Sequence, residues 1–295
     1  MTLTPEQLAN RLGAIGGSDC AAVLGVSRFK TCQQLYFEKR GELPVHHDES
    51  LVLRLGQVFE PGVRQIWSED TGRIVRQPTG TLAHPEYPEL IAHLDGFTGT
   101  GADLRGYEGK LALRSIGWGL EGTDQIPLDA LFQTQHYMAV TGIEVFDVVV
   151  LSGWRIKTYI VPADTELQSM ILEAELEFLQ RLKDGLPPPL DYQHKTALSF
   201  IKERYPGTNG ERVTATDELI HCRLDMIEAQ TLESEAHKRA EACKVRLLEF
   251  MGPRALLDFP DGKSLRRKAV DRPAYEVPPS HFVESRFINT PRSLS

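Results

Sequence analysis

The chain has 295 residues, of which 41% are hydrophobic and 25% are charged, and its formal net charge is -8 at pH 7. This composition is typical of a folded protein with one large domain or two ordinary ones. No stretch approaches the roughly 20 apolar residues of a membrane helix, and the first ten residues do not resemble a signal peptide, so we expect a cytoplasmic protein. The negative charge argues against a protein that coats nucleic acid, although it leaves the charge of a single cleft open.

The first two thirds of the chain combine helical and extended segments in the order typical of an α/β or α+β domain. After a helical N-terminus, the predicted helices lie near residues 57–70, 129–141 and 164–184, and the predicted strands near residues 80–115 and 145–161. Three successive prolines at residues 187–189 follow the last of these helices and mark its end. The sequence therefore predicts a domain over residues 1–190 and an extension over residues 191–295.

A long amphipathic segment dominates the extension. Thr214 and Asp217 have the spacing of a capping box, and apolar residues then recur every three or four positions. They are Leu219, Cys222, Met226, Ala229, Leu232, Ala236, Ala240, Cys243, Leu247 and Phe250. We expect one long helix ending at Gly252-Pro253, packed through its narrow stripe on one partner such as a coiled-coil neighbour. The following Asp261-Gly262 pair predicts a β-hairpin.

Charged side chains stand at the ends of two predicted strands. In LIAHLDGF, alternation places Asp95 at a strand end, on one face with His93, and in GYEGKLAL it places Glu108 and Lys110 on one face. Two carboxylates suit Mg²⁺ or Mn²⁺, and a lysine there stabilises a reacting phosphate or helps to ionise water. This pattern favours phosphodiester cleavage, but a Glu-x-Lys pair also occurs on solvated strands, and a lone histidine is more often a hydrogen-bonded bystander than a ligand.

Five segments, in order along the chain, carry a resemblance to a known family. They are RLGAIGGSDCAAVLGVSRFKT, LRLGQVFEPGVRQIWSEDTG, HPEYPELIAHLDG, YEGK and WGLEGTDQIPLDALFQTQHYMAVTG, and the resemblance spans most of residues 8–170. In these segments the chain resembles the YqaJ-like viral recombinases, the lambda-exonuclease-type branch of the PD-(D/E)XK nucleases. The resemblance implies an α/β (α+β) core with a mixed central sheet flanked by helices, followed by a C-terminal helical and β-hairpin extension.

The resemblance also implies a catalytic site. Asp95 and Glu108 match the two metal-binding acids of the family, and Lys110 matches its catalytic lysine. Glu60 matches a further acid on the preceding helix, which would hold or orient a second metal ion. The implied cofactor is Mg²⁺ or Mn²⁺.

Two further pairs of residues match family positions. Gln133 and Tyr137 form a Q-x-x-x-Y pair, whose i, i+4 spacing places both on one helix face, where they either enter the cleft or pack the helix on the sheet. Arg11 and Ser18 match the pocket for the 5′ phosphate of a DNA end. Ser18 is equally suited to capping the helix that begins beside it.

Two residues depart from the family pattern. Gly109 stands where the family has a large apolar residue, and Leu111 stands where a small polar residue is common. Since glycine weakens a strand and packs nothing, the fit around the metal ligands is in question, and reduced activity is one outcome. In the tail, SLRRKAVDRP either contacts a phosphate backbone or forms a solvated basic hairpin.

The function implied by the resemblance is a metal-dependent exonuclease. It would degrade linear double-stranded DNA from the 5′ end and leave 3′ single strands for phage-type recombination in the cytoplasm of a bacterial host. Family analogy adds a ring-shaped trimer and a single-strand annealing protein as partner. Two alternatives stay open: a structure-dependent endonuclease on the same core, and a DNA-end-binding or assembly protein with reduced catalysis.

Overall fold

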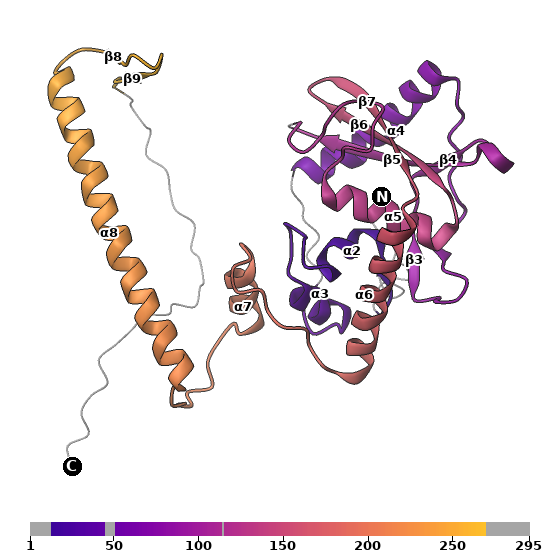
Figure 1. Ribbon diagram of the computed structural model, residues 1–295, viewed down its shortest axis with the longest axis horizontal. Coiled ribbons are helices and arrows are strands. Elements are labelled where there is room, and N and C mark those ends of the chain that lie inside the picture. The colour runs from indigo at the N-terminus through magenta and orange to yellow at the C-terminus, as the bar shows by residue number, and fades with distance from the viewer. Residues whose placement is uncertain (1–12, 45–50, 114, 270–295) are drawn as a thin grey trace. The chain divides into compact units, whose positions relative to one another are not determined.

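The computed structural model describes residues 13–44, 51–113 and 115–269, and the chain divides into two compact units after Tyr205 (Figure 1). The first unit contains two small sheets and six of the described helices. The second contains one long helix and a hairpin. No helix in the described ranges is long and apolar enough to span a membrane.

A four-stranded mixed sheet forms the centre of the first unit. Its strands, in spatial order, are β4 (Gly96–Thr98), β5 (Arg105–Ala112), β6 (Val145–Ser152) and β7 (Arg155–Pro162). β5 and β6 are parallel, and the other two pairs are antiparallel. β6 is almost wholly buried and its sequence VFDVVVLS is a nearly continuous apolar run, as expected of a strand covered on both faces.

Helices cover both faces of this sheet. Helix α4 (Leu51–Thr71) packs Val63 and Trp67 against Tyr107 of β5. Helix α5 (Leu128–Thr141) packs on the opposite face, where Tyr137 lies against Phe146 with ring centroids 6.2 Å apart. The predicted mixed sheet flanked by helices is therefore confirmed.

A second, three-stranded sheet supports the same core. Its strands are β1 (Ile15–Gly16), β3 (Leu90–Ala92) and β2 (Leu82–Ala83), and the helices beside it are α2 (Gly17–Val23), α3 (Cys32–Lys39) and α6 (Thr165–Asp184). His136 of α5 ties these parts together, because its Nδ1 lies 2.7 Å from Glu175 of α6 and its Nε2 lies 3.0 Å from the carbonyl oxygen of Ile91. Burial lowers the pKa of His136, but the neighbouring carboxylate of Glu175 outweighs burial and the net pKa is raised, so this contact favours the protonated imidazole.

The first unit extends past the prolines that suggested its end. Helix α7 (Ala197–Arg204) places Phe200, which is 1% exposed, in the main core, where it stacks on Phe37 with ring centroids 6.2 Å apart. The division after Tyr205 thus replaces the predicted boundary at residue 190. The prolines end helix α6 without ending the core, because the chain turns back and buries another aromatic side chain.

The second unit is built from the predicted long helix and hairpin. Helix α8 (Asp217–Met251) ends at Gly252, as expected, and strands β8 (Leu256–Asp258) and β9 (Ser264–Arg266) pair antiparallel around Asp261-Gly262. The helix begins two residues later than the predicted capping box. Its N-cap is Thr216, whose hydroxyl accepts a hydrogen bond from the backbone N–H of Leu219.

Candidate active site

Strand β5 brings a carboxylate and an ammonium together. Because side chains alternate along the strand, Glu108 and Lys110 lie on one face, and Lys110 Nζ donates to Glu108 Oε1 over 2.7 Å. Glu108 is 3% exposed, whereas the side chain of Lys110 is 27% exposed and reaches solvent. The pair therefore combines a buried carboxylate with a partly accessible cation.

Helix α5 adds an amide and a phenol to this pair. Gln133 Oε1 accepts from Lys110 Nζ over 2.7 Å, and Gln133 Nε2 donates to Glu108 Oε1 and to the Tyr137 hydroxyl, each over 2.9 Å. One helical turn separates the two α5 residues, so they share the face that meets β5. The i, i+4 spacing thus brings both side chains to β5, where Gln133 contacts the Glu108–Lys110 pair and Tyr137 also packs in the main core against Phe146.

Asp95 reaches the site from a different position than expected. Strand β3 ends at Ala92, so Asp95 belongs to the link before β4 and not to the end of a strand that also holds His93. Its Oδ2 accepts from the backbone N–H of Gly109 over 2.8 Å. β4 pairs with β5 only as far as Tyr107, so the N–H of Gly109 at this edge is taken by a carboxylate instead of a strand.

Glu60 approaches β5 from the face opposite to Glu108 and Lys110. Its Cγ would lie 3.6 Å from a Cβ placed on Gly109, and the same Cβ would lie 3.6 Å from Asp95 Oδ2. The glycine thus leaves open the space between these two carboxylates. Asp95 stands at the strand edge, between Glu60 on one face and Glu108 on the other.

The negative charges of Glu108, Asp95 and Glu60 are only partly balanced by nearby positive charges. Burial, together with the negative charge of Asp95, raises the pKa of Glu108 to about 8, even though Lys110 acts in the opposite direction. Burial also raises the pKa of Asp95, and burial with the charge of Asp95 raises that of Glu60. Burial lowers the pKa of Lys110, but the negative charge of Glu108 outweighs it and the net pKa is raised. The site therefore favours an additional positive charge.

A divalent ion fits this donor set. Glu108 Oε2 is buried, and no group in the described ranges hydrogen-bonds it. In the same ranges no group of three His, Cys, Asp or Glu side chains is already arranged to hold a metal ion. This agrees with two features of the site: Lys110 occupies one oxygen of Glu108, and Glu60 lies on the opposite face of β5. Mg²⁺ and Mn²⁺ are held in proteins by one or two carboxylates with several waters, so Asp95 and the unpaired oxygen of Glu108 are suitable donors.

Helix α2 begins beside the site. A Cβ on Gly17 would stand 2.6 Å from Cε1 of Tyr137 and 3.0 Å from Cγ of Gln133, so only glycine permits this close approach. Ser18 follows it and is exposed. The N-cap of this helix is Gly16, whose N–H donates to Asp19 over 3.1 Å, so Ser18 is not the cap. Arg11 lies outside the described residues.

Sequence reasoning missed two residues of this region. Arg64 lies 3.6 Å from Glu60 and donates to the backbone oxygen of Asp95 over 3.4 Å. Its i, i+4 spacing from Glu60 is the signal that would have identified it. Tyr107 has a buried hydroxyl to which no described group bonds, and its Oη would lie 3.6 Å from a Cβ on Gly109. His93, in contrast, bonds Thr81 over 3.0 Å.

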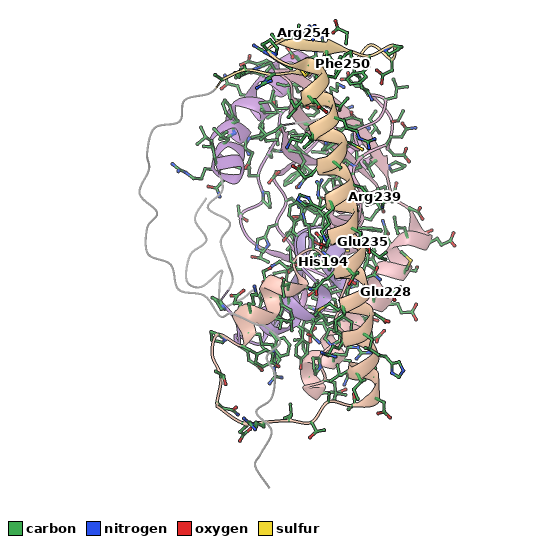
Figure 2. All side chains as sticks on the ribbon, turned by 90° about the vertical axis from the view of Figure 1, so that its left-hand side faces the viewer. His194, Glu228, Glu235, Arg239, Phe250 and Arg254 are labelled. Atoms are coloured by element: carbon green, nitrogen blue, oxygen red, sulfur yellow. The ribbon has the colours of Figure 1, made fainter. Side chains whose placement is uncertain are left out.

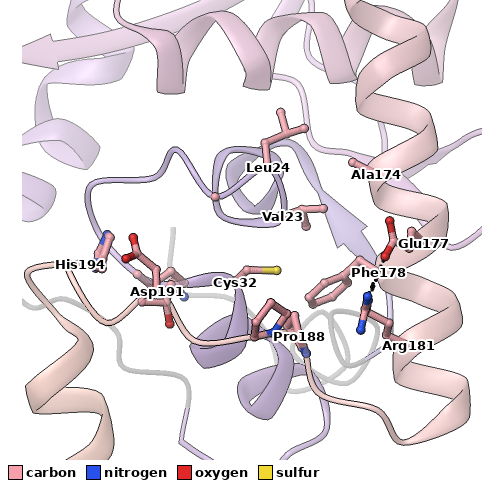
Figure 3. Close-up of a pocket in the computed structure, with 14 residues that line it drawn as sticks. Val23, Leu24, Cys32, Ala174, Glu177, Phe178, Arg181, Pro188, Asp191 and His194 are labelled. Carbon is pink, nitrogen blue, oxygen red and sulfur yellow. Dashed lines mark hydrogen bonds and ion pairs between the residues drawn. The ribbon is translucent and has the colours of Figure 1, made fainter. Parts of the chain in front are cut away.

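A cavity of about 360 Å³ lies elsewhere in the first unit (Figure 3). Cys32 and Phe178 line its wall, beside the Glu177–Arg181 ion pair of 2.9 Å. Burial raises the pKa of the Cys32 thiol to about 11, so this cysteine is unreactive at neutral pH. None of the site residues lines this cavity.

Comparison with known proteins finds a family whose model matches part of this chain. Residues 6–144 match the YqaJ-like viral recombinase domain. The chain is 30% identical over 211 residues to the uncharacterized protein YqaJ of Bacillus subtilis strain 168, over 70% of this chain and 65% of that protein. The chain thus spans less than two thirds of the length of that relative.

Solved structures with this fold include an alkaline exonuclease, LHK-Exo, from Laribacter hongkongensis. The TM-score is 0.51 at 22% identity, over 62% of this chain and 94% of that chain, and a complex of LHK-Exo with dAMP gives 0.52 at 23% identity over the same shares. This likeness confirms the predicted α/β fold. By sequence, residues 6–144 of this chain are similar to the YqaJ-like viral recombinase domain.

Proposed function

We propose that this protein is a metal-dependent exonuclease that degrades one strand of linear double-stranded DNA from its 5′ end. The observation that carries the proposal is a hydrogen-bonded group of Glu108, Lys110 and Gln133, next to which Asp95 accepts a hydrogen bond from the backbone N–H of Gly109. The family and the exonuclease fold support the same reaction class. The proposed setting is the cytoplasm of a bacterial host, with the gene of phage or prophage origin.

The metal site of this proposal consists of Asp95 and Glu108, with Glu60 holding or orienting a second ion. When bound by these carboxylates, Mg²⁺ or Mn²⁺ would supply Lewis-acid chemistry, which polarises a phosphate and makes water easier to ionise. The raised pKa values of the three carboxylates support this assignment, because a cation relieves the charge that burial disfavours.

The other side chains act on the phosphate and the attacking water. Lys110, protonated and partly exposed, stabilises the negative charge that develops on the phosphate or helps to ionise the water. Gln133 orients that water, and Tyr137 fixes Gln133 through its hydroxyl. Ser18, with its hydroxyl not engaged as the helix cap, is proposed to contact the 5′ phosphate together with Arg11.

The assembly completes the proposal. The expected arrangement is a ring of three chains around the duplex, acting with a single-strand annealing protein that receives the 3′ overhang. An acidic exterior is compatible with processive digestion in such a ring, since only the bore must be basic.

The decisive experiment compares two DNA substrates in Mg²⁺. The linear duplex carries a 5′ phosphate and is labelled at either the 5′ or the 3′ end of one strand. We expect the 5′ label to be released before the 3′ label. Closed circular DNA should stay intact. Lys110→Ala should abolish this release, whereas Lys202→Ala, which removes an exposed lysine of α7, should not.

The same experiment separates the alternatives. Nicking of the closed circle favours the structure-dependent endonuclease. Binding of DNA ends without degradation, equal for wild type and Lys110→Ala, favours the end-binding protein and refutes the exonuclease. Early release of the 3′ label contradicts the proposed direction of digestion but not the exonuclease reaction.

A further inference from the structure

Helix α8 is long, and within its own unit most of its apolar side chains are exposed. It has 35 residues, and among its described side chains Leu247 and Leu248 are half-buried, Met251 is buried and the others are exposed. Large apolar side chains stand in solvent, including Leu219 at 57% and Phe250 at 72% exposure. Figure 2 labels Glu228, Glu235, Arg239 and Phe250 along the helix. Helices in proteins depend on packing of an apolar face, so this face requires a partner.

The apolar face of α8 follows one heptad register from end to end. The first core position of each heptad holds Leu219, Met226, Glu233, Ala240 and Leu247, and the second holds Cys222, Ala229, Ala236, Cys243 and Phe250. Nine of these ten residues are apolar or small. Such a register, kept over the whole helix, is the pattern of a coiled coil.

This register is symmetric about the middle of the helix. When two copies of α8 run antiparallel about an axis between residues 234 and 235, every core residue meets one core residue of the second copy. The facing pairs are Leu219 with Phe250, Cys222 with Leu247, Met226 with Cys243, Ala229 with Ala240, and Glu233 with Ala236. Large residues meet near the ends and alanines meet near the centre, where small side chains allow a close approach of about 8 Å between helix axes.

The charge of α8 also favours the antiparallel arrangement. Residues 217–235 contain six acidic and one basic residue, whereas residues 236–251 contain four basic and two acidic ones. An antiparallel pair sets the acidic half of each helix against the basic half of the other. A parallel pair in register sets like halves together and is disfavoured.

Individual flanking residues fit the same alignment. Asp225 of one copy faces Arg246 of the other, and the polar core residue Glu233 lies beside Arg239 of the second copy. Arg223 faces Lys244, an unfavourable pair, but Lys244 is already paired with Glu241 of its own helix over 3.3 Å. A charged residue in the core, matched only in one alignment, fixes register and orientation.

We infer that α8 is a dimerisation element that binds α8 of a second copy of this chain as an antiparallel coiled coil. The pairing has two-fold symmetry and uses one helix from each chain, so it doubles whatever assembly the first unit forms. It is independent of the nuclease chemistry, because it uses none of the site residues.

Cysteine cross-linking of the full chain tests the orientation. Cys222 and Cys243 are exposed, and in the antiparallel alignment neither faces a cysteine. Met226→Cys should form a disulfide-linked dimer under mild oxidation, because residue 226 faces Cys243 of the second copy, and adding Cys243→Ser should abolish it. Leu224→Cys, on the outer face, is the matched control. An equally efficient dimer through Cys222 of the otherwise unchanged chain indicates parallel pairing and overturns the inference.

Light scattering of the full chain tests the association. Ala240→Glu places a second charge in the core and should halve the molar mass, whereas Thr231→Glu on the outer face should leave it unchanged. Asp225→Arg should weaken the association about tenfold, and the double variant with Arg246→Asp should restore it. A mass that is the same for the wild type and Ala240→Glu, whether α8 docks on its own chain or on another protein, refutes the inference.

Discussion

Metal binding at the candidate site should depend steeply on pH, because Glu108 has to lose its proton to act as a ligand. Its pKa is about 8. Below that value each pH unit should lower the apparent affinity for Mg²⁺ or Mn²⁺ about tenfold, or about 1.4 kcal/mol. Between about pH 8, where half of the Glu108 carboxyl is already protonated, and pH 6 the expected loss is about 50-fold, or about 2.3 kcal/mol. A carboxylate with an ordinary pKa near 4.5 would give no such loss.

Calorimetric titration with Mn²⁺ measures this directly. In two buffers of different ionisation enthalpy, the heats should report the release of about one proton per ion near pH 6.5 and almost none above about pH 9. Glu108→Gln should remove both the binding and the proton release. Glu173→Gln, an exposed position on α6, should change neither. An affinity that stays constant between about pH 6 and pH 9 would refute the argument.

Three further predictions concern packing around the site. Burial lowers the pKa of His136, but the charge of Glu175 outweighs it and the net pKa is raised. His136→Ala should therefore lower the free energy of unfolding by about 3 kcal/mol near pH 6, measured by chemical denaturation. This loss should shrink as the pH rises through the raised pKa, because the protonated imidazole is what stabilises the fold. Gly17→Ala should slow DNA cleavage about tenfold to 100-fold in single-turnover assays by displacing the ring of Tyr137, whereas Gly62→Ala, which meets open space, should not; equal rates contradict the geometry. Phe200→Ala should lower the free energy of unfolding of the first unit by about 3–5 kcal/mol, and a change below about 1 kcal/mol would return the boundary to residue 190.

Local periodicity predicted several parts of the site. The two-residue repeat of a strand put Glu108 and Lys110 on one face, and the spacing of one helical turn put Gln133 beside Tyr137. These geometric expectations hold because each depends only on the repeat of a single element. The catalytic roles attached to these residues stay proposals.

Other features depended on contacts between distant segments. Asp95 meets Gly109 because β4 pairs with β5 and then stops, and no local pattern shows where that pairing ends. Glu60 approaches Gly109 because α4 packs on one particular face of β5. The first unit continues to Tyr205 because Phe200 packs on a helix more than 150 residues earlier in the chain, a contact that a run of prolines does not reveal.

The sequence alone therefore indicated the longer helices and which side chains share a face within one element, because these follow from neighbouring residues. The tertiary structure decided that a buried carboxylate at Glu108 shares its site with Asp95 and Lys110, and that its pKa is raised. The physical reason is that burial and charge coupling arise only when separate elements pack together, so the acidity of a side chain is a property of the folded core and not of its place in the chain.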